Sequence, residues 1–148
     1  MPIESKESTV PFTQNQMFDL VSDIDSYDKF LPWCNKSTII SKKPLKDGSF
    51  EMIADLEIGY KSLTYTYRSK VFLSADKNYI EVTNIEGPFN HLINKWSFEE
   101  LPDQKCKIIF FINFEIKIKM FNDLISEFFE NAFKKMVDSF ESRARNIY

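Results

Sequence analysis

The spacing of apolar residues changes near residue 120 of this chain, from every second residue to about every 3.6 residues. Between residues 37 and 119 apolar and polar side chains alternate, as they do in strands with one buried face. The clearest apolar row is Cys106, Ile108, Phe110, Ile112, Phe114, Ile116 and Ile118. Ile109 and Phe111 break the polar register of this strand, which leaves a homodimer open. The pattern predicts an antiparallel sheet with one apolar face, followed by a helix that covers it.

Turn signals divide the alternating region into six strands. Glycine, proline, asparagine and aspartate residues mark turns at residues 46–48, 59, 76–78, 87–88 and 102–103. One more strand is predicted at residues 5–12, where Pro11 favours a position at the edge of a sheet. The sheet is therefore predicted to contain seven antiparallel strands.

Two short helices are predicted after the first strand. Thr13 can cap a helix over residues 14–21, in which apolar residues recur at helical spacing. Asp23 or Asp25 can cap a second short helix that reaches Phe30.

A single long helix is predicted after Met120. Its apolar stripe consists of Phe121, Leu124, Ile125, Phe128, Ala132, Met136, Phe140 and Ala144, widened by Phe129, Phe133 and Val137. A stripe this wide should lie across the apolar face of the sheet. The prediction is one α+β domain over residues 1–148, with a curved sheet wrapped on the C-terminal helix in the helix-grip arrangement.

Composition excludes several classes of protein. A formal net charge of −3 argues against general nucleic-acid binding. Cys34 and Cys106 have no paired spacing, which predicts a reduced cytoplasmic setting rather than a disulfide framework. The sequence shows no leader peptide and no apolar run long enough to cross a membrane. The 15 Phe, 6 Tyr and 2 Trp fit either a large lined cavity or an AT-rich coding bias.

Two loops are unusually apolar. The first contains Phe30, Leu31, Pro32 and Trp33, and its proline prevents a helix or a strand from continuing there. Such side chains either plug the end of the core or contact an apolar partner. The second is the turn Gly87-Pro88-Phe89. The two loops are candidates for a lid or a membrane-contacting rim at the mouth of a cavity.

Several local sequences carry a resemblance to one family. They are residues 23–34 (DIDSYDKFLPWC), 86–89 (EGPF), 96–98 (WSF), 114–115 (FE) and 136–144 (MVDSFESRA). With these sequences in this order, the chain resembles the coenzyme-Q-binding branch of the START superfamily, a group of polyketide cyclase-like proteins. The resemblance extends from residue 8 to residue 148. It departs from the family pattern at Asp28, where a proline usually follows the tyrosine.

The resemblance implies a non-enzymatic protein that binds or chaperones ubiquinone, or a similar isoprenoid lipid, and supports respiratory electron transfer. Because residues 1–10 lack a leader pattern, we expect a bacterial cytoplasmic protein that transiently contacts the inner face of the membrane, where the quinone resides. Some bacterial members are ribosome-association toxins, which bind the large ribosomal subunit and block subunit joining. That function is the alternative here, and the basic cluster that could serve it is Lys134, Lys135, Arg143 and Arg145.

A quinone site should be apolar with a few donors, because the ligand is mostly hydrocarbon and its head carries two carbonyl acceptors. The candidate ligand-binding residues are Phe30, Leu31, Pro32, Trp33, Met52, Leu56, Tyr65, Tyr67, Pro88, Phe89, Trp96, Phe98, Phe110, Ile112, Phe114, Leu124 and Phe128. Tyr65, Tyr67 or Trp96 can donate to a ligand carbonyl. For each residue taken singly, core packing is the alternative.

No catalytic residue, catalytic cofactor or metal ligand is predicted. Asp55, Glu57 and Glu115 fall on the polar register of their strands, and the single histidine, His91, follows the Gly87-Pro88-Phe89 turn. The sequence shows no Gly-rich phosphate loop, metal-ligand cluster or nucleophile triad.

Overall fold

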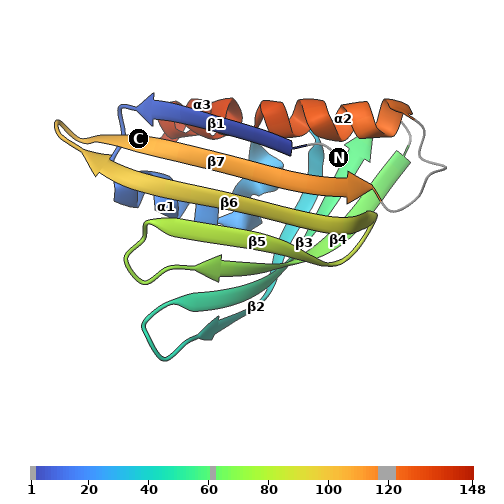
Figure 1. Ribbon diagram of the computed structural model, residues 1–148, viewed down its shortest axis with the longest axis horizontal. Helices are drawn as coiled ribbons and strands as arrows, with labels where there is room; N and C mark the ends of the chain where they lie inside the picture. Colours follow the sequence, from blue (N-terminus) through green and yellow to red (C-terminus); the bar gives the residue numbers. More distant parts are fainter. Residues whose placement is uncertain (1–2, 61–62, 117–122) are drawn as a thin grey trace.

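The computed structural model describes residues 3–60, 63–116 and 123–148. Seven antiparallel strands form one curved sheet in the order β1-β7-β6-β5-β4-β3-β2 (Figure 1). The strands are β1 (Ile3–Val10), β2 (Cys34–Pro44), β3 (Phe50–Tyr60), β4 (Leu63–Leu73), β5 (Tyr79–Glu86), β6 (Phe89–Leu101) and β7 (Lys105–Ile116). The predicted seven-stranded antiparallel sheet is confirmed, and β1 lies at an edge as Pro11 indicated.

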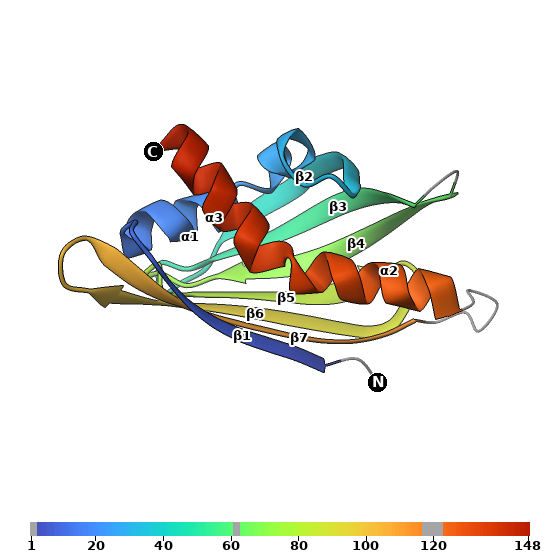
Figure 2. The ribbon, with the colours of Figure 1, turned by 90° about the horizontal axis from the view of Figure 1, so that it is seen from above.

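The helices lie together on one side of the sheet, which curves around them (Figure 2). They are α1 (Gln14–Ser22), the 3-10 helix η1 (Ile24–Lys29), α2 (Asp123–Lys134) and α3 (Met136–Ile147). The sheet face toward them carries the predicted apolar rows. In β7, for example, Cys106, Ile108, Phe110, Ile112 and Phe114 are all buried. The core therefore sits between this face and the helices.

The C-terminal helix was predicted to be continuous, and this is wrong: it breaks at Lys135 (Figure 2). The Lys135 N–H is shared between the carbonyls of Asn131 and Ala132, each at 3.2 Å. The carbonyl of Lys135 accepts from both the N–H and the hydroxyl of Ser139, each at 2.9 Å. A serine hydroxyl that bonds the carbonyl four residues earlier bends helices, which accounts for the change of direction.

The two short helices form where the sequence predicts, but only one is capped as expected. Thr13 caps α1, because its hydroxyl accepts from the Gln16 N–H while the Gln16 side chain accepts from the Thr13 N–H. Asp23 occupies the corresponding position of η1 without a capping bond. The carboxylate of Asp25 instead accepts from the N–H of Ile39 in β2, at 2.7 Å. It therefore ties η1 to the sheet.

Thr13→Ala should lower the free energy of unfolding by about 0.5–2 kcal/mol, because it removes the side-chain half of the capping box. Urea denaturation measures the loss. Thr13→Ser keeps the hydroxyl and serves as the matched control, so an equal loss in both variants would contradict this origin.

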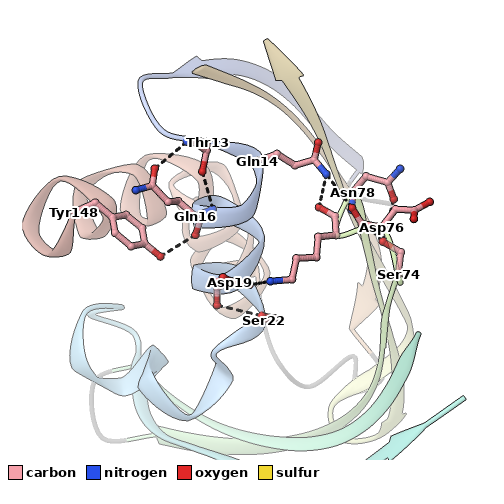
Figure 3. A network of polar contacts seen from close by, with 10 residues as sticks. Thr13, Gln14, Gln16, Asp19, Ser22, Ser74, Asp76, Asn78 and Tyr148 are labelled. Carbon is pink, nitrogen blue, oxygen red and sulfur yellow. Dashed lines mark hydrogen bonds and ion pairs between the residues drawn. The ribbon is translucent and has the colours of Figure 1, made fainter. Parts of the chain in front are cut away.

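Helix α1 is attached to the β4–β5 turn and to the end of α3 (Figure 3). The Gln14 amide donates to the carbonyls of Asp76 and Lys77, at 3.0 and 2.9 Å. The Lys77 ammonium pairs with Asp19 at 2.9 Å. The Tyr148 hydroxyl donates to the carbonyl of Gln16, at 2.9 Å. The Gln14 and Lys77 contacts hold α1 to the β4–β5 turn, and the Tyr148 contact holds α1 to the end of α3.

Within the described ranges, no helix is both long enough and apolar enough to cross a bilayer.

Candidate functional site

A small cavity of about 50 Å³ lies between the inner face of the sheet and the junction of α2 with α3. Strands β3 to β7 contribute Ala54, Leu56, Ile58, Tyr67, Ser69, Val71, Val82, Leu92, Asn94, Trp96 and Ile112. The start of β2 contributes Cys34, and the helices and the loop after η1 contribute Ile24, Tyr27, Leu31, Trp33, Phe133, Met136 and Phe140. None of these described lining residues is an acidic or basic residue.

Strand register explains why residues distant in sequence meet in this cavity. Val71 is opposite Val82, Val82 is opposite Asn94, and Asn94 is opposite Ile112. Directly opposed residues in antiparallel strands project to the same face of the sheet. One row of side chains therefore crosses four strands and forms part of the cavity wall.

The apolar loop after η1 contains one buried residue and three that are partly or fully exposed. Leu31 is buried, Phe30 and Trp33 are half-buried, and Pro32 is exposed. The loop is also held by its backbone, because the carbonyl of Trp33 accepts from the N–H of Gly59 in β3, at 3.0 Å. Leu31 thus packs into the core, whereas Phe30, Pro32 and Trp33 leave apolar surface exposed.

The Gly87-Pro88-Phe89 turn points into the core rather than forming a rim. Pro88 and Phe89 are both buried. The Phe89 ring packs edge-on against Tyr67 and Phe114, with centroids 5.4 and 6.0 Å apart. Gly87 has a φ of +145°, and a Cβ added to it would lie 2.5 Å from the Cβ of Tyr67. The turn therefore packs against Tyr67, which lines the cavity.

The structure brings six of the predicted ligand-binding residues to the cavity: Leu31, Trp33, Leu56, Tyr67, Trp96 and Ile112. Others are buried in the core away from the lining, namely Met52, Pro88, Phe89, Phe98, Phe110 and Phe114. Half-buried positions against the core belong to Phe30, Tyr65 and Phe128, while Pro32 is exposed. The side chain of Leu124 lies outside the described residues.

The polar groups of the lining differ in whether they already have partners. The Trp96 indole donates to the Asn94 side-chain oxygen, and the Asn94 amide donates to the carbonyl of Phe111, each at 3.0 Å. The sequence suggested that the Trp96 indole could donate to a ligand. In the structure the indole N–H already donates to Asn94. The Ser69 hydroxyl is buried without a hydrogen bond, and the Tyr67 hydroxyl bonds no other described residue.

The phenols of the lining stay neutral at physiological pH. Burial raises the pKa of Tyr67, and the nearby Cys34 thiol raises it further. Burial likewise raises the pKa of Tyr27, whose hydroxyl donates to the carbonyl of Val21. These groups can therefore offer O–H donors and lone pairs but no charge.

Sequence reasoning missed Ser69 and Asn94 as members of this site. A signal was present, because each is a polar residue at an inward position of a strand whose other inward residues are mostly apolar. Buried polar residues in such positions need a partner. Asn94 finds it in Trp96 and Phe111, whereas Ser69 does not.

Both thiols should react slowly in the folded protein. Burial raises the pKa of Cys34 and of Cys106 to about 11. The thiolate fraction at pH 8 is then about 10⁻³, against about one quarter for an ordinary thiol. We expect labelling by a thiol reagent to be at least about 100-fold slower in buffer than in urea. In Cys106→Ser the only thiol is that of Cys34. Rapid labelling of Cys34 in buffer would contradict the prediction and show that the cavity opens often.

One family model, described as polyketide cyclase / dehydrase and lipid transport, matches residues 10–141. That range includes every residue of the cavity lining. The chain belongs to this family. Membership in the polyketide cyclase and lipid-transport family confirms the resemblance found in the sequence.

The named relatives include proteins of two kinds. The ribosome association toxin RatA of Rickettsia prowazekii is 36% identical, covering 93% of this chain and 92% of the relative. The mitochondrial coenzyme Q-binding protein COQ10 homolog B of Xenopus laevis is 35% identical, covering 99% of this chain and 59% of the relative. Both functions implied by the sequence are therefore represented among family members.

Solved structures confirm the helix-grip fold. A START superfamily protein from Mycobacterium smegmatis superposes with a TM-score of 0.79 at 16% identity, covering 99% of each chain. The Zhui aromatase/cyclase from a Streptomyces species gives a TM-score of 0.80 at 12% identity, covering 97% of this chain and 93% of that one. At these identities the likeness concerns the fold alone.

The family description names both a cyclase or dehydrase activity and lipid transport, so the chemistry of the lining is informative. Its titratable groups are Tyr27, Tyr67 and Cys34, and the pKa of each is raised. General acid–base catalysis works best with a pKa near the working pH. His91 lies outside the lining and bonds Asn113 at 3.1 Å. The described part of the chain also has no cluster of three metal-ligating side chains. The lining suits binding by packing and hydrogen bonds.

Proposed function

We propose that this protein binds ubiquinone, or a similar isoprenoid lipid, between the sheet and the C-terminal helices, without catalysing a reaction. The observation that carries the proposal is the cavity lining, which is apolar apart from a few neutral polar groups. Such a surface matches a molecule that is largely hydrocarbon with two carbonyl acceptors. The coenzyme Q-binding relative supports the same ligand class.

Binding requires the cavity to widen. Its volume of about 50 Å³ is well below the roughly 150 Å³ of an engineered cavity that holds benzene. Phe133 and Met136 line the cavity on either side of the helix break at Lys135. Methionine is unbranched and repacks readily. We infer that the ligand enters by displacing these two side chains as α2 moves relative to α3.

Intrinsic fluorescence tests the proposal directly, because both tryptophans of the chain, Trp33 and Trp96, line the cavity. Titration with decylubiquinone should quench the fluorescence and reach saturation at one ligand per chain. Trp33→Phe leaves Trp96 as the single reporter, so quenching must persist in it. A linear, unsaturable decrease in both proteins would contradict the proposal.

Trp33→Ala should weaken decylubiquinone binding about 5- to 10-fold, which corresponds to roughly 1–1.4 kcal/mol. The melting temperature should fall by less than about 5 °C, because Trp33 is only half-buried and its backbone bond to Gly59 remains. Leu31→Ala is the matched comparison. It empties a buried site and should lower the free energy of unfolding by about 2–5 kcal/mol. Similar loss of stability in both variants would mean that Trp33 is a core residue.

The proposed ligand also suggests where the protein acts. A quinone that resides in the membrane must be collected there, and we propose that the rim formed by Phe30, Pro32 and Trp33 contacts the inner face of the bacterial membrane transiently. Respiratory electron transfer would be the process served. Flotation with quinone-containing vesicles tests this contact, with Trp33→Ala expected to float less.

Binding to the large ribosomal subunit is the second candidate, and the RatA relative is the observation that favours it. The basic cluster predicted for this role is largely paired. Lys134 lies 3.8 Å from Glu4, and Arg145 pairs with Glu141 one turn earlier. The Arg143 guanidinium stacks over the Phe30 ring at 5.4 Å. Co-sedimentation with the large subunit at physiological salt would support this candidate, and its absence would remove it.

Ile109 and Phe111 leave a half-buried apolar pair on the outer face of β7. We propose a homodimer through this face as a further property, tested by the molecular mass in solution of the wild type and of Phe111→Lys.

A further inference from the structure

Ser69 is buried, and its hydroxyl has no hydrogen-bond partner among the described residues. It lies on the inner face of β4, between Tyr67 and Val71, and is 4% exposed. Its oxygen has no hydrogen bond, although it lines the cavity. The other two serines that are buried in the described ranges are bonded: Ser37 accepts from the N–H of Asp28 at 3.1 Å, and Ser49 donates to the carboxylate of Asp47.

A buried hydroxyl without a partner destabilises the folded protein. An alanine at this position would fill nearly the same volume without that penalty. Ser69 is therefore poorly explained by packing, and its position in the cavity wall indicates a partner that is not part of the chain. Groups that lower stability at a binding surface are characteristic of functional sites.

The surroundings of Ser69 limit what that partner can be. Tyr67 lies two residues along the same face of β4, and its hydroxyl bonds no other described residue. Asn94, across β5, already bonds Trp96 and Phe111. Both available groups are thus neutral hydroxyls. An ionised head would lose its hydration here without gaining a cation among the described lining residues.

We propose that the Ser69 hydroxyl, with that of Tyr67, forms the head-group site, and that this site selects ligands with a neutral, carbonyl-bearing head over ligands with an ionised head. This inference rests on the proposed lipid-binding function and specifies it. The apolar remainder of the lining accepts the tail, while the two hydroxyls donate to the head. A quinone meets this requirement, whereas a fatty-acid carboxylate does not.

The test compares decylubiquinone with laurate, an ionised ligand of similar tail length, by tryptophan fluorescence at pH 8. Wild type should bind decylubiquinone at least 10-fold more tightly than laurate. Ser69→Ala should weaken decylubiquinone binding about 5- to 10-fold, and its melting temperature should equal or exceed that of wild type. Tyr67→Phe should also weaken binding.

Ser37→Ala is the matched control, because Ser37 is also buried but is bonded and lies outside the lining. It should melt at a lower temperature with unchanged affinity. The inference is overturned if Ser69→Ala binds decylubiquinone as wild type does, if its melting temperature falls, or if laurate binds equally well. Binding by wild type with no effect of Ser69→Ala would remove this inference alone, whereas absence of wild-type binding would remove the proposed function with it.

Discussion

Gly87→Ala should be among the most destabilising substitutions in this protein, lowering the free energy of unfolding by about 2–6 kcal/mol. Two effects add. The φ of +145° is one that side-chain-bearing residues rarely adopt. A Cβ at this position would also lie 2.5 Å from the Cβ of Tyr67 and 3.0 Å from its Cα, so the backbone of β4 would have to shift.

The melting temperature measures this loss, which should amount to roughly 4–20 °C for a chain of this size. Gly48→Ala is the matched control. Gly48 also has a positive φ, of +89°, but a Cβ there would meet only Ala75, at an ordinary 3.5 Å. Its loss should reflect backbone strain alone, about 1–3 kcal/mol. Equal losses in the two variants would show that the contact with Tyr67 is unimportant.

Phe140→Ala should lower the free energy of unfolding by about 3–5 kcal/mol. Phe140 is fully buried on α3. Its ring meets Tyr27 and Phe30 at centroid distances of 5.1 Å and Trp96 at 5.2 Å, each edge-on. Truncation removes all three aromatic contacts and leaves a void that the rigid sheet can fill only in part.

The same substitution should enlarge the cavity, because Phe140 is one of its lining residues. Urea denaturation with and without benzene separates the two effects. Benzene should restore part of the lost stability in Phe140→Ala and have little effect on wild type. Phe50→Ala, at an exposed position away from the lining, should lose less than about 1 kcal/mol. If Phe140→Ala is as stable as wild type in the absence of benzene, the core has closed over the void and the prediction is wrong.

The fold could be predicted from sequence because period-two patterning is strict in the strands. The inward residues of β7 are buried at every predicted position from Cys106 to Phe114. A shift of one residue would have moved all of them to solvent, so the register is strongly determined. The helix cap at Thr13 was equally predictable, because a threonine followed by a glutamine three residues later is a local capping signal.

The helix break could not be predicted from the apolar stripe. Phe133, Met136 and Phe140 keep helical spacing across Lys135, so periodicity alone indicates a continuous helix. The bend depends on the Ser139 hydroxyl bonding the Lys135 carbonyl, and an exposed serine has the same sequence appearance whether or not it does so. Asp25 was misassigned for a related reason, because its partner in β2 is fourteen residues away.

The site was predicted in outline and not in detail. Inward aromatic residues of the strands could be named from their register, and Tyr67 and Trp96 do reach the cavity. Residues of the same register such as Phe110 and Phe114 lie outside its lining, because a cavity is the small remainder left after close packing. Its volume is set by side-chain contacts from helices and strands together, which the pattern of a single strand does not contain.

The break at Lys135 has a thermodynamic consequence for the two proposed functions. If lipid entry moves α2 relative to α3, then any macromolecule that grips these helices more tightly in one arrangement changes the lipid affinity. Linkage requires the lipid to change that macromolecule's affinity by the same factor. The affinity of a ribosomal contact through α3 would then depend on whether the cavity holds a lipid. Lipid binding and ribosome association would be coupled through the same movement of α2 relative to α3.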